Sequence, residues 1–163
     1  MKNFKKVATG ITAATVMMSM MAFTSCSRVS SKVVVDEADF DESISVIEID
    51  TSMENITLYK SEDDETHVKF AHSETFKTEI EVKGDTLVVS EKNKFTISSF
   101  NFTSDEVYLE IYLPEDSYDK IDIDVASADI YAVEGIDFDE IDIDSASGNI
   151  NIKDMNAGDI KID

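Results

Sequence analysis

IDIDVASADIYAVE at residues 121–134 returns as IDIDSASGNINIKD at residues 141–154, so the chain repeats itself with a period of 20 residues. The two copies are identical at seven of their fourteen positions, and a third, partial copy, DIKID, follows at residues 159–163. Fixed periods of about 20–50 residues are typical of stacked architectures, in which each repeat buries the apolar face of its neighbour. The sequence therefore predicts short parallel β-solenoid coils over residues 119–163.

Apolar and acidic residues alternate within each repeat. Ile121 and Ile123 are two positions apart, so they lie on one face of a strand, and Asp122 and Asp124 lie on the other. Stacking the coils places Ile121 beside Ile141. The repeat thus predicts a spine of isoleucines inside the solenoid and a ladder of aspartates outside it.

The segments Ser127–Asp129 and Ser147–Asn149 separate the strands of each copy and predict its corner. Aspartate and asparagine tolerate left-handed backbone, and Gly148 adopts it without a steric penalty. Ala128 stands at the matching place in the first copy, so a positive φ is not required in every corner.

The chain upstream of the repeats shows the same alternation, which predicts half-buried strands. These strands are expected over residues 44–50, 55–59, 67–71, 78–82, 86–90 and 107–113. Gly84-Asp85 is a two-residue hairpin loop, and Pro114 ends the last strand because it has no N–H to donate. We therefore expect an all-β protein, with an antiparallel meander over residues 44–113 that leads into the solenoid coils.

The composition excludes several classes of function. The 163 residues include 14 Lys and Arg against 35 Asp and Glu, a formal net charge of -21. Nucleic-acid binding needs clustered basic residues, so no nucleic-acid partner is expected. The single cysteine excludes an internal disulfide framework and a cysteine-based zinc site.

The amino terminus has the features of an export signal. Three lysines and no acid lie in residues 1–25, and Val7–Ser27 carries no charge. Phe23-Thr24-Ser25-Cys26 resembles the bacterial lipobox, which implies a lipoprotein signal peptide over residues 1–25 and lipid attachment at Cys26. The alternatives are a cleaved signal with an incidental cysteine and an uncleaved anchor helix. Residues 26–43 would form a tether that can add a first strand at Val33–Val35.

Residues 44–163, with their SASG-type corner and the phrase YLPED at residues 112–116, resemble the bacterial putative-adhesin family of head-GIN-like β-solenoids. That resemblance implies a domain of unknown function on exported, lipid-anchored envelope proteins, with no assigned catalytic residue. We accordingly expect a non-catalytic, adhesin-like protein on the extracytoplasmic side of the bacterial cell envelope. Its partners would be the membrane, through the lipid, and another envelope protein, a polysaccharide or a host surface. The alternative is a cation-binding or envelope-stress sensor that acts with a membrane partner.

The aspartate ladder is the candidate metal site. Carboxylates on neighbouring strands would stand about 4.8 Å apart, and a bridging Ca²⁺ would relieve their repulsion. The candidate ligands are Asp122, Asp124, Asp142 and Asp144. The competing interpretation is a solvated acidic face that keeps the protein soluble. No other cofactor is expected.

The motifs of the common enzyme classes are missing from the sequence. It has no glycine-rich phosphate loop and no GxSxG elbow, and its only arginine, Arg28, falls in the predicted tether. His67 and His72 do not form an HExxH pattern, so we expect them to have a strand or surface role.

Two features leave alternatives open. Family members usually continue through more coils, so the strand edge at residues 159–163 belongs to a truncated fragment, is blunted by Lys161 and Asp163, or pairs with another chain. Phe95, Ile97, Phe100 and Phe102 either cover the open end of the core or form an exposed patch that meets a partner.

Overall fold

The computed structural model describes residues 33–52, 55–73, 78–91, 107–132, 135–153 and 156–163. These residues form twelve β-strands and their connections. In chain order the strands are β1 (Val33–Phe40), β2 (Val46–Thr51), β3 (Asn55–Lys60), β4 (Thr66–Ser73), β5 (Thr78–Lys83), β6 (Thr86–Glu91), β7 (Tyr108–Leu113), β8 (Ser117–Val125), β9 (Ile130–Ala132), β10 (Asp137–Ser145), β11 (Ile150–Ile152) and β12 (Ala157–Ile162). No helix in this part of the chain is long and apolar enough to cross a membrane.

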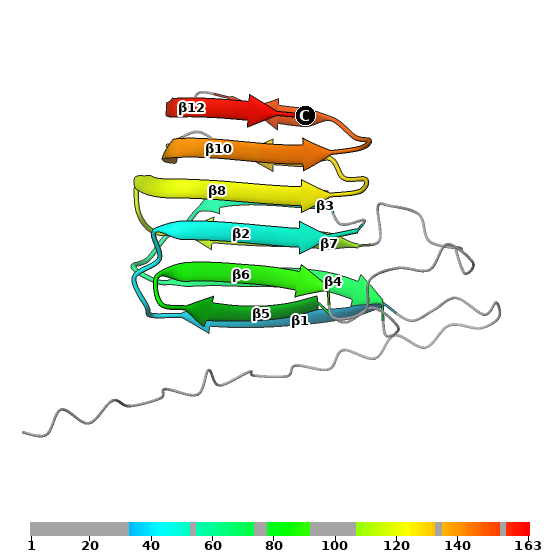
Figure 1. The fold of residues 1–163 in the computed structure, drawn as a ribbon. Coiled ribbons are helices and arrows are strands. Elements are labelled where there is room, and N and C mark those ends of the chain that lie inside the picture. Colours follow the sequence, from blue (N-terminus) through cyan, green and yellow to red (C-terminus); the bar gives the residue numbers. More distant parts are fainter. Residues whose placement is uncertain (1–32, 53–54, 74–77, 92–106, 133–134, 154–155) are drawn as a thin grey trace, which may run out of the picture.

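Two six-stranded sheets pack face to face (Figure 1). Sheet 1 has the order β12-β10-β8-β2-β6-β5, and sheet 2 has the order β1-β4-β7-β3-β9-β11. Alternating aliphatic residues from both sheets fill the space between them and form one core. The all-β class predicted from alternation is confirmed.

The predicted stacking of the repeats is also confirmed. β10 pairs in parallel with β8, and the register places Ile121 beside Ile141 and Asp122 beside Asp142. β12 pairs in parallel with the other edge of β10 and adds Ile160 to the same row. Successive windings thus stack their isoleucines inside and their aspartates outside, as a 20-residue period requires.

The first half of the chain is more mixed than the antiparallel meander that we expected. β2 pairs in parallel with β6 and β8, and β3 pairs in parallel with β7 and β9. The reason lies in residues 47–58, whose sequence IEIDTSMENITL is a further copy of the repeat. It forms its own coil, with Ile47 in register with Ile121 and Ile56 in register with Ile130. Parallel coils therefore extend well upstream of residue 119.

Hydrogen bonds between successive corners hold the coils together. The Asn55 side-chain oxygen accepts from the Asp129 backbone N–H at 3.1 Å. The Asp129 carboxylate accepts from the backbone N–H of Asn149 at 2.8 Å and from its side-chain amide at 2.9 Å. Gly148 has a φ of +134°, and a Cβ there would lie 1.8 Å from the Ala128 carbonyl oxygen. The corner therefore needs a glycine for close approach as well as for its backbone angle.

The two ends of the solenoid differ. At one end the pairing is antiparallel: β5 pairs with β6 in sheet 1, and β4 pairs with both β7 and β1 in sheet 2. These antiparallel strands close the stack. The hairpin between β5 and β6 turns at Gly84, whose φ of +72° confirms the predicted loop. β1 includes the first strand expected at Val33–Val35. At the other end β11 and β12 are the outermost strands among the described residues, and Ile160 and Ile162 are 60% and 50% exposed.

Aromatic packing supports the middle of the stack. The Tyr118 and Phe138 rings lie 5.5 Å apart between centroids, and both side chains are buried. The backbone N–H of Glu115 donates to the Tyr118 hydroxyl at 3.0 Å, which satisfies that buried polar group. Burial raises the pKa of Tyr118 to about 12.

Candidate functional site

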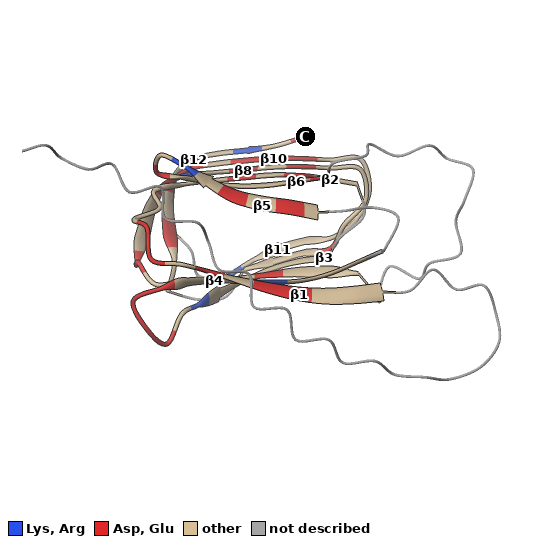
Figure 2. Cartoon of the chain, turned by 90° about the horizontal axis from the view of Figure 1, so that it is seen from below, with Lys and Arg blue, Asp and Glu red and all other residues tan. Residues whose placement is uncertain are grey.

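The outer face of sheet 1 carries the predicted aspartate ladder. Acidic positions recur along its strands (Figure 2), with Glu48 in register with Asp122 and Asp50 in register with Asp124. Lys120 Nζ lies 3.1 Å from an Asp122 carboxylate oxygen and 2.9 Å from one of Glu140. The hydrogen bond with Glu140, followed by that with Asp122, raises the pKa of Lys120, so its ammonium group stays charged. The ladder thus carries its own counter-charge.

Lysine also reaches the outermost rung of the ladder. Lys161 Nζ lies 3.2 Å from Asp142 and 2.8 Å from Asp163. Within the described part of the chain, no group of three or more His, Cys, Asp or Glu side chains is arranged to hold a metal ion. The repeat pattern predicted the aspartates of the ladder, but it did not predict that Lys120 and Lys161 would pair with them. The calcium site therefore stays a prediction.

A cleft of about 330 Å³ lies at the carboxyl ends of β2, β8 and β10. Asp50, Asp124 and Asp144 line it, one from each coil, together with Thr51, Ser52, Glu91, Val125, Ala126 and Ala146. The Ser52 hydroxyl donates to the Glu91 carboxylate at 2.6 Å. Two of the predicted calcium ligands, Asp124 and Asp144, thus line this cleft. The other two, Asp122 and Asp142, are not among its lining residues.

The outer face of sheet 2 has a different character, because tyrosines gather on it. Along β7 the core residues Leu109 and Ile111 alternate with Tyr108 and Tyr112, which therefore point outward. Tyr59 on β3 is in register with Tyr112, and the two rings stack with centroids 4.9 Å apart. Tyr131 on β9 follows on the same face and is 41% exposed. We call Tyr59, Tyr108, Tyr112 and Tyr131 the tyrosine face.

Polar groups accompany these rings. Burial and the neighbouring Glu110 carboxylate raise the pKa of Tyr112 to about 12, and its hydroxyl donates to Glu110 at 3.2 Å. Lys69 Nζ lies 3.8 Å from Glu110 and 5.8 Å from the centre of the Tyr108 ring. On this face the Glu110 carboxylate thus has both a lysine and a tyrosine hydroxyl as partners.

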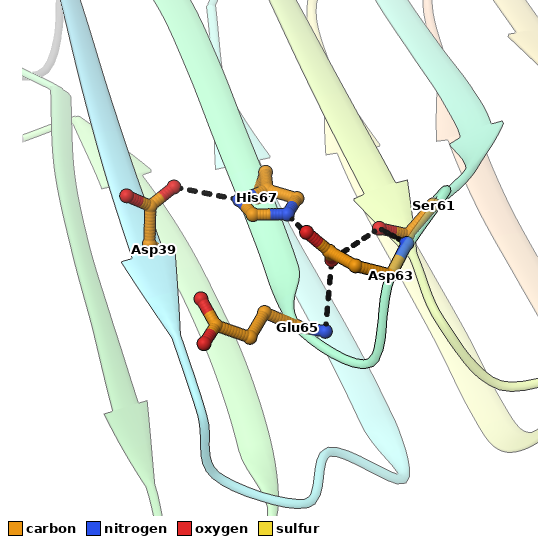
Figure 3. Close-up of polar contacts among 5 residues, drawn as sticks. All are labelled: Asp39, Ser61, Asp63, Glu65 and His67. Carbon is orange, nitrogen blue, oxygen red and sulfur yellow. Dashed lines mark hydrogen bonds and ion pairs between the residues drawn. The ribbon is translucent and has the colours of Figure 1, made fainter.

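His67 lies at the edge of the tyrosine face, between two carboxylates (Figure 3). Its Nδ1 atom lies 2.7 Å from Asp39 on β1, and its Nε2 atom lies 2.8 Å from Asp63 in the loop before β4. The hydrogen bond with Asp39 raises the pKa of His67, the bond with Asp63 raises it further, and partial burial opposes both. The hydrogen bond between His67 and the Asp63 carboxylate lowers the pKa of Asp63, and a second hydrogen bond from the Glu65 backbone N–H lowers it further.

The second histidine has a related position. His72 Nε2 lies 3.1 Å from a carboxylate oxygen of Asp36, again joining β4 to β1. The strand role expected for both histidines is confirmed, since both belong to β4. Their carboxylate partners were not expected, because the pairing of β1 with β4 joins segments about 30 residues apart. Cys26, the predicted lipid-attachment residue, and the aromatic residues at 95–102 lie outside the described residues.

Solved structures with the same fold include two from bacteria. A putative cell adhesion protein from Clostridium sporogenes is 16% identical with a TM-score of 0.50, over 72% of this chain and 58% of that one. A putative adhesin from Bacteroides fragilis is 15% identical with a TM-score of 0.52, over 82% of this chain and 61% of that one. The chain thus spans about three fifths of the length of these structures. Among curated proteins none matches it.

The sequence profile of one protein family accounts for the repeats and the strands that precede them. The match runs over residues 44–163, which include every strand from β2 to β12. The resemblance to a family of adhesin-like β-solenoids of unknown function is thereby confirmed. This chain belongs to the Toastrack DUF4097 family.

Proposed function

We propose that this protein is an exported, lipid-anchored protein of the bacterial cell envelope whose β-solenoid domain is a non-catalytic binding module. The tyrosine face on sheet 2 is the observation that carries the proposal, and a neutral polysaccharide is the partner that fits it best. The lipid at Cys26 would hold the domain on the extracytoplasmic side of a membrane.

The tyrosine face has the composition of a recognition surface. Tyrosine is enriched at interfaces because it offers a large apolar ring with a polar tip and loses little conformational entropy on binding. Four of the five tyrosines of the chain lie on this one face, and Tyr131 exposes 41% of its surface. A purely structural strand face exposed to water would more commonly carry Thr, Lys and Glu.

The surroundings of the rings favour a neutral polymer. The face is part of a broad sheet, which suits an extended chain better than a single inserted side chain. Thr57 and Asn151 supply hydroxyl and amide groups on the same side of sheet 2 as Tyr131, and sugars can exchange hydrogen bonds with such groups. The net charge of -21 would repel anionic polymers. The names of the two similar structures, an adhesion protein and an adhesin, agree with a binding role.

Co-sedimentation with insoluble neutral polysaccharides and with whole bacterial cells tests the proposal. The Tyr131→Ala substitution removes an exposed ring, and Tyr112→Ala removes one half of the stacked pair. We expect each to reduce the bound fraction about tenfold, because loss of a well-placed aromatic residue commonly weakens binding by 1 kcal/mol or more. The matched control is Glu48→Gln on the opposite face, which should bind like the unmodified chain.

Two results would contradict the polysaccharide assignment. Equal binding by the tyrosine variants and the control would remove the tyrosine face from the site. Binding to cells that survives enzymatic removal of their glycans, yet is lost with Tyr131→Ala, would assign the face to a protein partner. Metabolic labelling with a palmitate analogue tests the anchor separately, since Cys26→Ser should abolish the label.

A further inference from the structure

His67 lies next to the tyrosine face, and one row of outward side chains joins the two. β4 pairs antiparallel with β7, and the register places His67 opposite Tyr112. Tyr112 is in turn opposite Tyr59, so an imidazole and two phenol rings follow one another across three neighbouring strands. Side chains directly opposite each other on one face of a sheet have Cβ atoms about 5 Å apart. The His67 side chain is 33% exposed, so a polymer that lies over Tyr112 reaches the imidazole as well.

The two hydrogen bonds of His67 require a charged imidazole. Nδ1 lies 2.7 Å from Asp39, and Nε2 lies 2.8 Å from Asp63. A carboxylate only accepts, so both ring nitrogens must carry a proton for both contacts to be hydrogen bonds. The Ser61 hydroxyl and the Glu65 backbone N–H also donate to Asp63, each at 3.1 Å, and hold its carboxylate in place. A neutral imidazole has a single N–H and leaves one of the two carboxylates facing a lone pair.

The loss of this proton changes the edge of the tyrosine face. It adds one negative charge and deprives a carboxylate of a hydrogen bond, so that carboxylate has to be hydrated instead. A neutral sugar placed over it would have to remove that water at a cost in free energy. We propose that His67 is a positioning residue of the tyrosine face, through which this face binds a neutral polysaccharide more tightly at low pH than at high pH. This inference rests on the function proposed above and adds the regulation of the same site.

His67 is the group near this edge whose charge changes around neutral pH. The titratable and charged groups that surround it from its own strand and from the elements packed against it are Asp39 and Glu37 on β1, Asp63 in the loop before β4, Glu65 and Lys69 beside it in the chain, and Tyr112 and Glu110 on β7. The hydrogen bond with His67 lowers the pKa of Asp63, and burial raises the pKa of Tyr112 to about 12, so neither titrates near pH 7. An imidazole is the side chain that ordinarily does so.

The second histidine of the chain provides an internal control. His72 lies on the same strand, but it is only 8% exposed and alternates with His67, so it lies on the inner side of β4. Its Nε2 atom has one carboxylate partner, Asp36, at 3.1 Å. A substitution of His72 therefore alters a histidine of β4 without altering the outward row that includes Tyr112.

Co-sedimentation between about pH 5.5 and 8.5 tests the proposal. The probes are cellulose, mannan and curdlan, insoluble neutral polysaccharides that do not titrate in this range. The dissociation constant of the unmodified chain should rise about two- to fivefold as the pH rises above 6.5, the factor that one partly exposed ion pair supplies. His67→Gln keeps a hydrogen-bonding side chain without the charge change, so its binding should not vary with pH. His72→Gln should vary as the unmodified chain does, and circular dichroism checks that both variants keep their strands.

Nuclear magnetic resonance of the two histidine rings measures the same coupling from the other side. Linkage is reciprocal, so a bound soluble oligosaccharide of the same sugar should raise the pKa of His67 by about 0.3–0.7, the logarithm of the factor above. It should leave the titration curve of His72 unchanged.

The outcomes separate this inference from the function on which it rests. A chain that binds none of the polysaccharides, or a Tyr131→Ala variant that binds as well as the unmodified chain, would overturn both. Binding that Tyr131→Ala weakens, but that does not vary with pH or still varies in His67→Gln, would overturn the role of His67 alone. An oligosaccharide that binds and leaves the pKa of His67 where it was would do the same.

Discussion

The Nδ1 atom of His67 on β4 lies 2.7 Å from a carboxylate oxygen of Asp39 on β1, while Nε2 of the same ring lies 2.8 Å from Asp63. The imidazole of His67 therefore links β1, an edge strand of sheet 2, to the loop between β3 and β4. Both contacts are hydrogen bonds from the ring only when the imidazole is protonated. The attachment of β1 should for this reason depend on pH.

The sign of the dependence follows from the shifted pKa. The hydrogen bond with Asp39 raises the folded-state pKa of His67 above its ordinary 6.5. This stabilisation is complete below pH 6.5 and is lost as the pH rises through the folded-state value. We expect the free energy of unfolding to fall as the pH rises above 6.5 through the raised pKa of His67, and only modestly, because the pair is partly solvated.

Urea unfolding at several pH values measures this loss. Asp39→Asn keeps an acceptor for His67 but removes the charge, so it should flatten the dependence. Hydrogen exchange of the β1 amides should quicken over the same pH range. A profile unchanged by Asp39→Asn would assign the dependence to other groups, among them Asp63 and Tyr112, which also lie beside His67.

The corner between β10 and β11 depends on the absence of a side chain at residue 148. Gly148→Ala forces an L-residue to a φ of +134° and places its Cβ 1.8 Å from the Ala128 carbonyl oxygen. We expect a loss of more than about 2 kcal/mol in the free energy of unfolding, since backbone strain and overpacking add. The control is Gly84→Ala, at a φ of +72° with no atom within 4 Å of the added Cβ, which should cost only about 1 kcal/mol. Equal losses in urea titrations would contradict the close approach of the corners.

Much of this architecture is readable from the sequence because neighbouring coils use the same residues. Ile121, Ile141 and Ile160 recur 20 and then 19 residues apart, and the register places them in one row. The coil at residues 47–58 is harder to recognise because its corner reads TSME, where the later copies read VASA and SASG. β2, the first strand of this coil, pairs with β6 and β8, which lie far along the chain. Antiparallel pairing between strands that follow each other in sequence was therefore the simpler expectation.

The candidate surfaces were harder to predict than the fold. Alternation alone places Tyr108 and Tyr112 on one side of their strand. Adding Tyr59 and Tyr131 to them requires knowing that β3 lies between β7 and β9. The contact of His67 with Asp39 requires the pairing of β1 with β4 in the same way. Sites assembled across parallel coils depend on this long-range order, which a local pattern does not contain.

The side-chain ladder at the corners makes a separate prediction. Asp129→Ala removes the acceptor for two N–H groups of Asn149, at 2.8 and 2.9 Å. We expect a loss of about 1–2 kcal/mol, the range for hydrogen bonds to charged groups at partly exposed sites. Asp129→Asn keeps an oxygen in the same place and should recover most of the loss in thermal or urea unfolding. If Asp129→Asn is as destabilising as Asp129→Ala, the charge of Asp129 matters rather than the bond.

Replacing an isoleucine of the row by alanine should lower the free energy of unfolding more where the isoleucine is more deeply buried. Ile121 is 2% exposed and Ile160 is 60% exposed, although both belong to the same row, on either side of Ile141. Ile121→Ala should lower the free energy of unfolding by about 2–5 kcal/mol, because it leaves a cavity between coils. Ile160→Ala should cost less than about 1 kcal/mol, because most of its side chain is exposed. Similar losses at the two positions would mean that the end of the solenoid is covered.

The calcium site predicted at Asp122, Asp124, Asp142 and Asp144 can be tested against the lysines that share the ladder. Lys120 Nζ already lies 3.1 Å from Asp122 and 2.9 Å from Glu140, so a bridging Ca²⁺ has to compete with an ammonium group. Lys120→Met removes that competitor while keeping the aliphatic stem. Calcium that binds the ladder should raise the melting temperature more than sodium chloride of equal ionic strength does, and the rise should be larger in Lys120→Met. A melting temperature that calcium does not move in either protein would leave the ladder as a solvated acidic face, whose charge serves solubility alone.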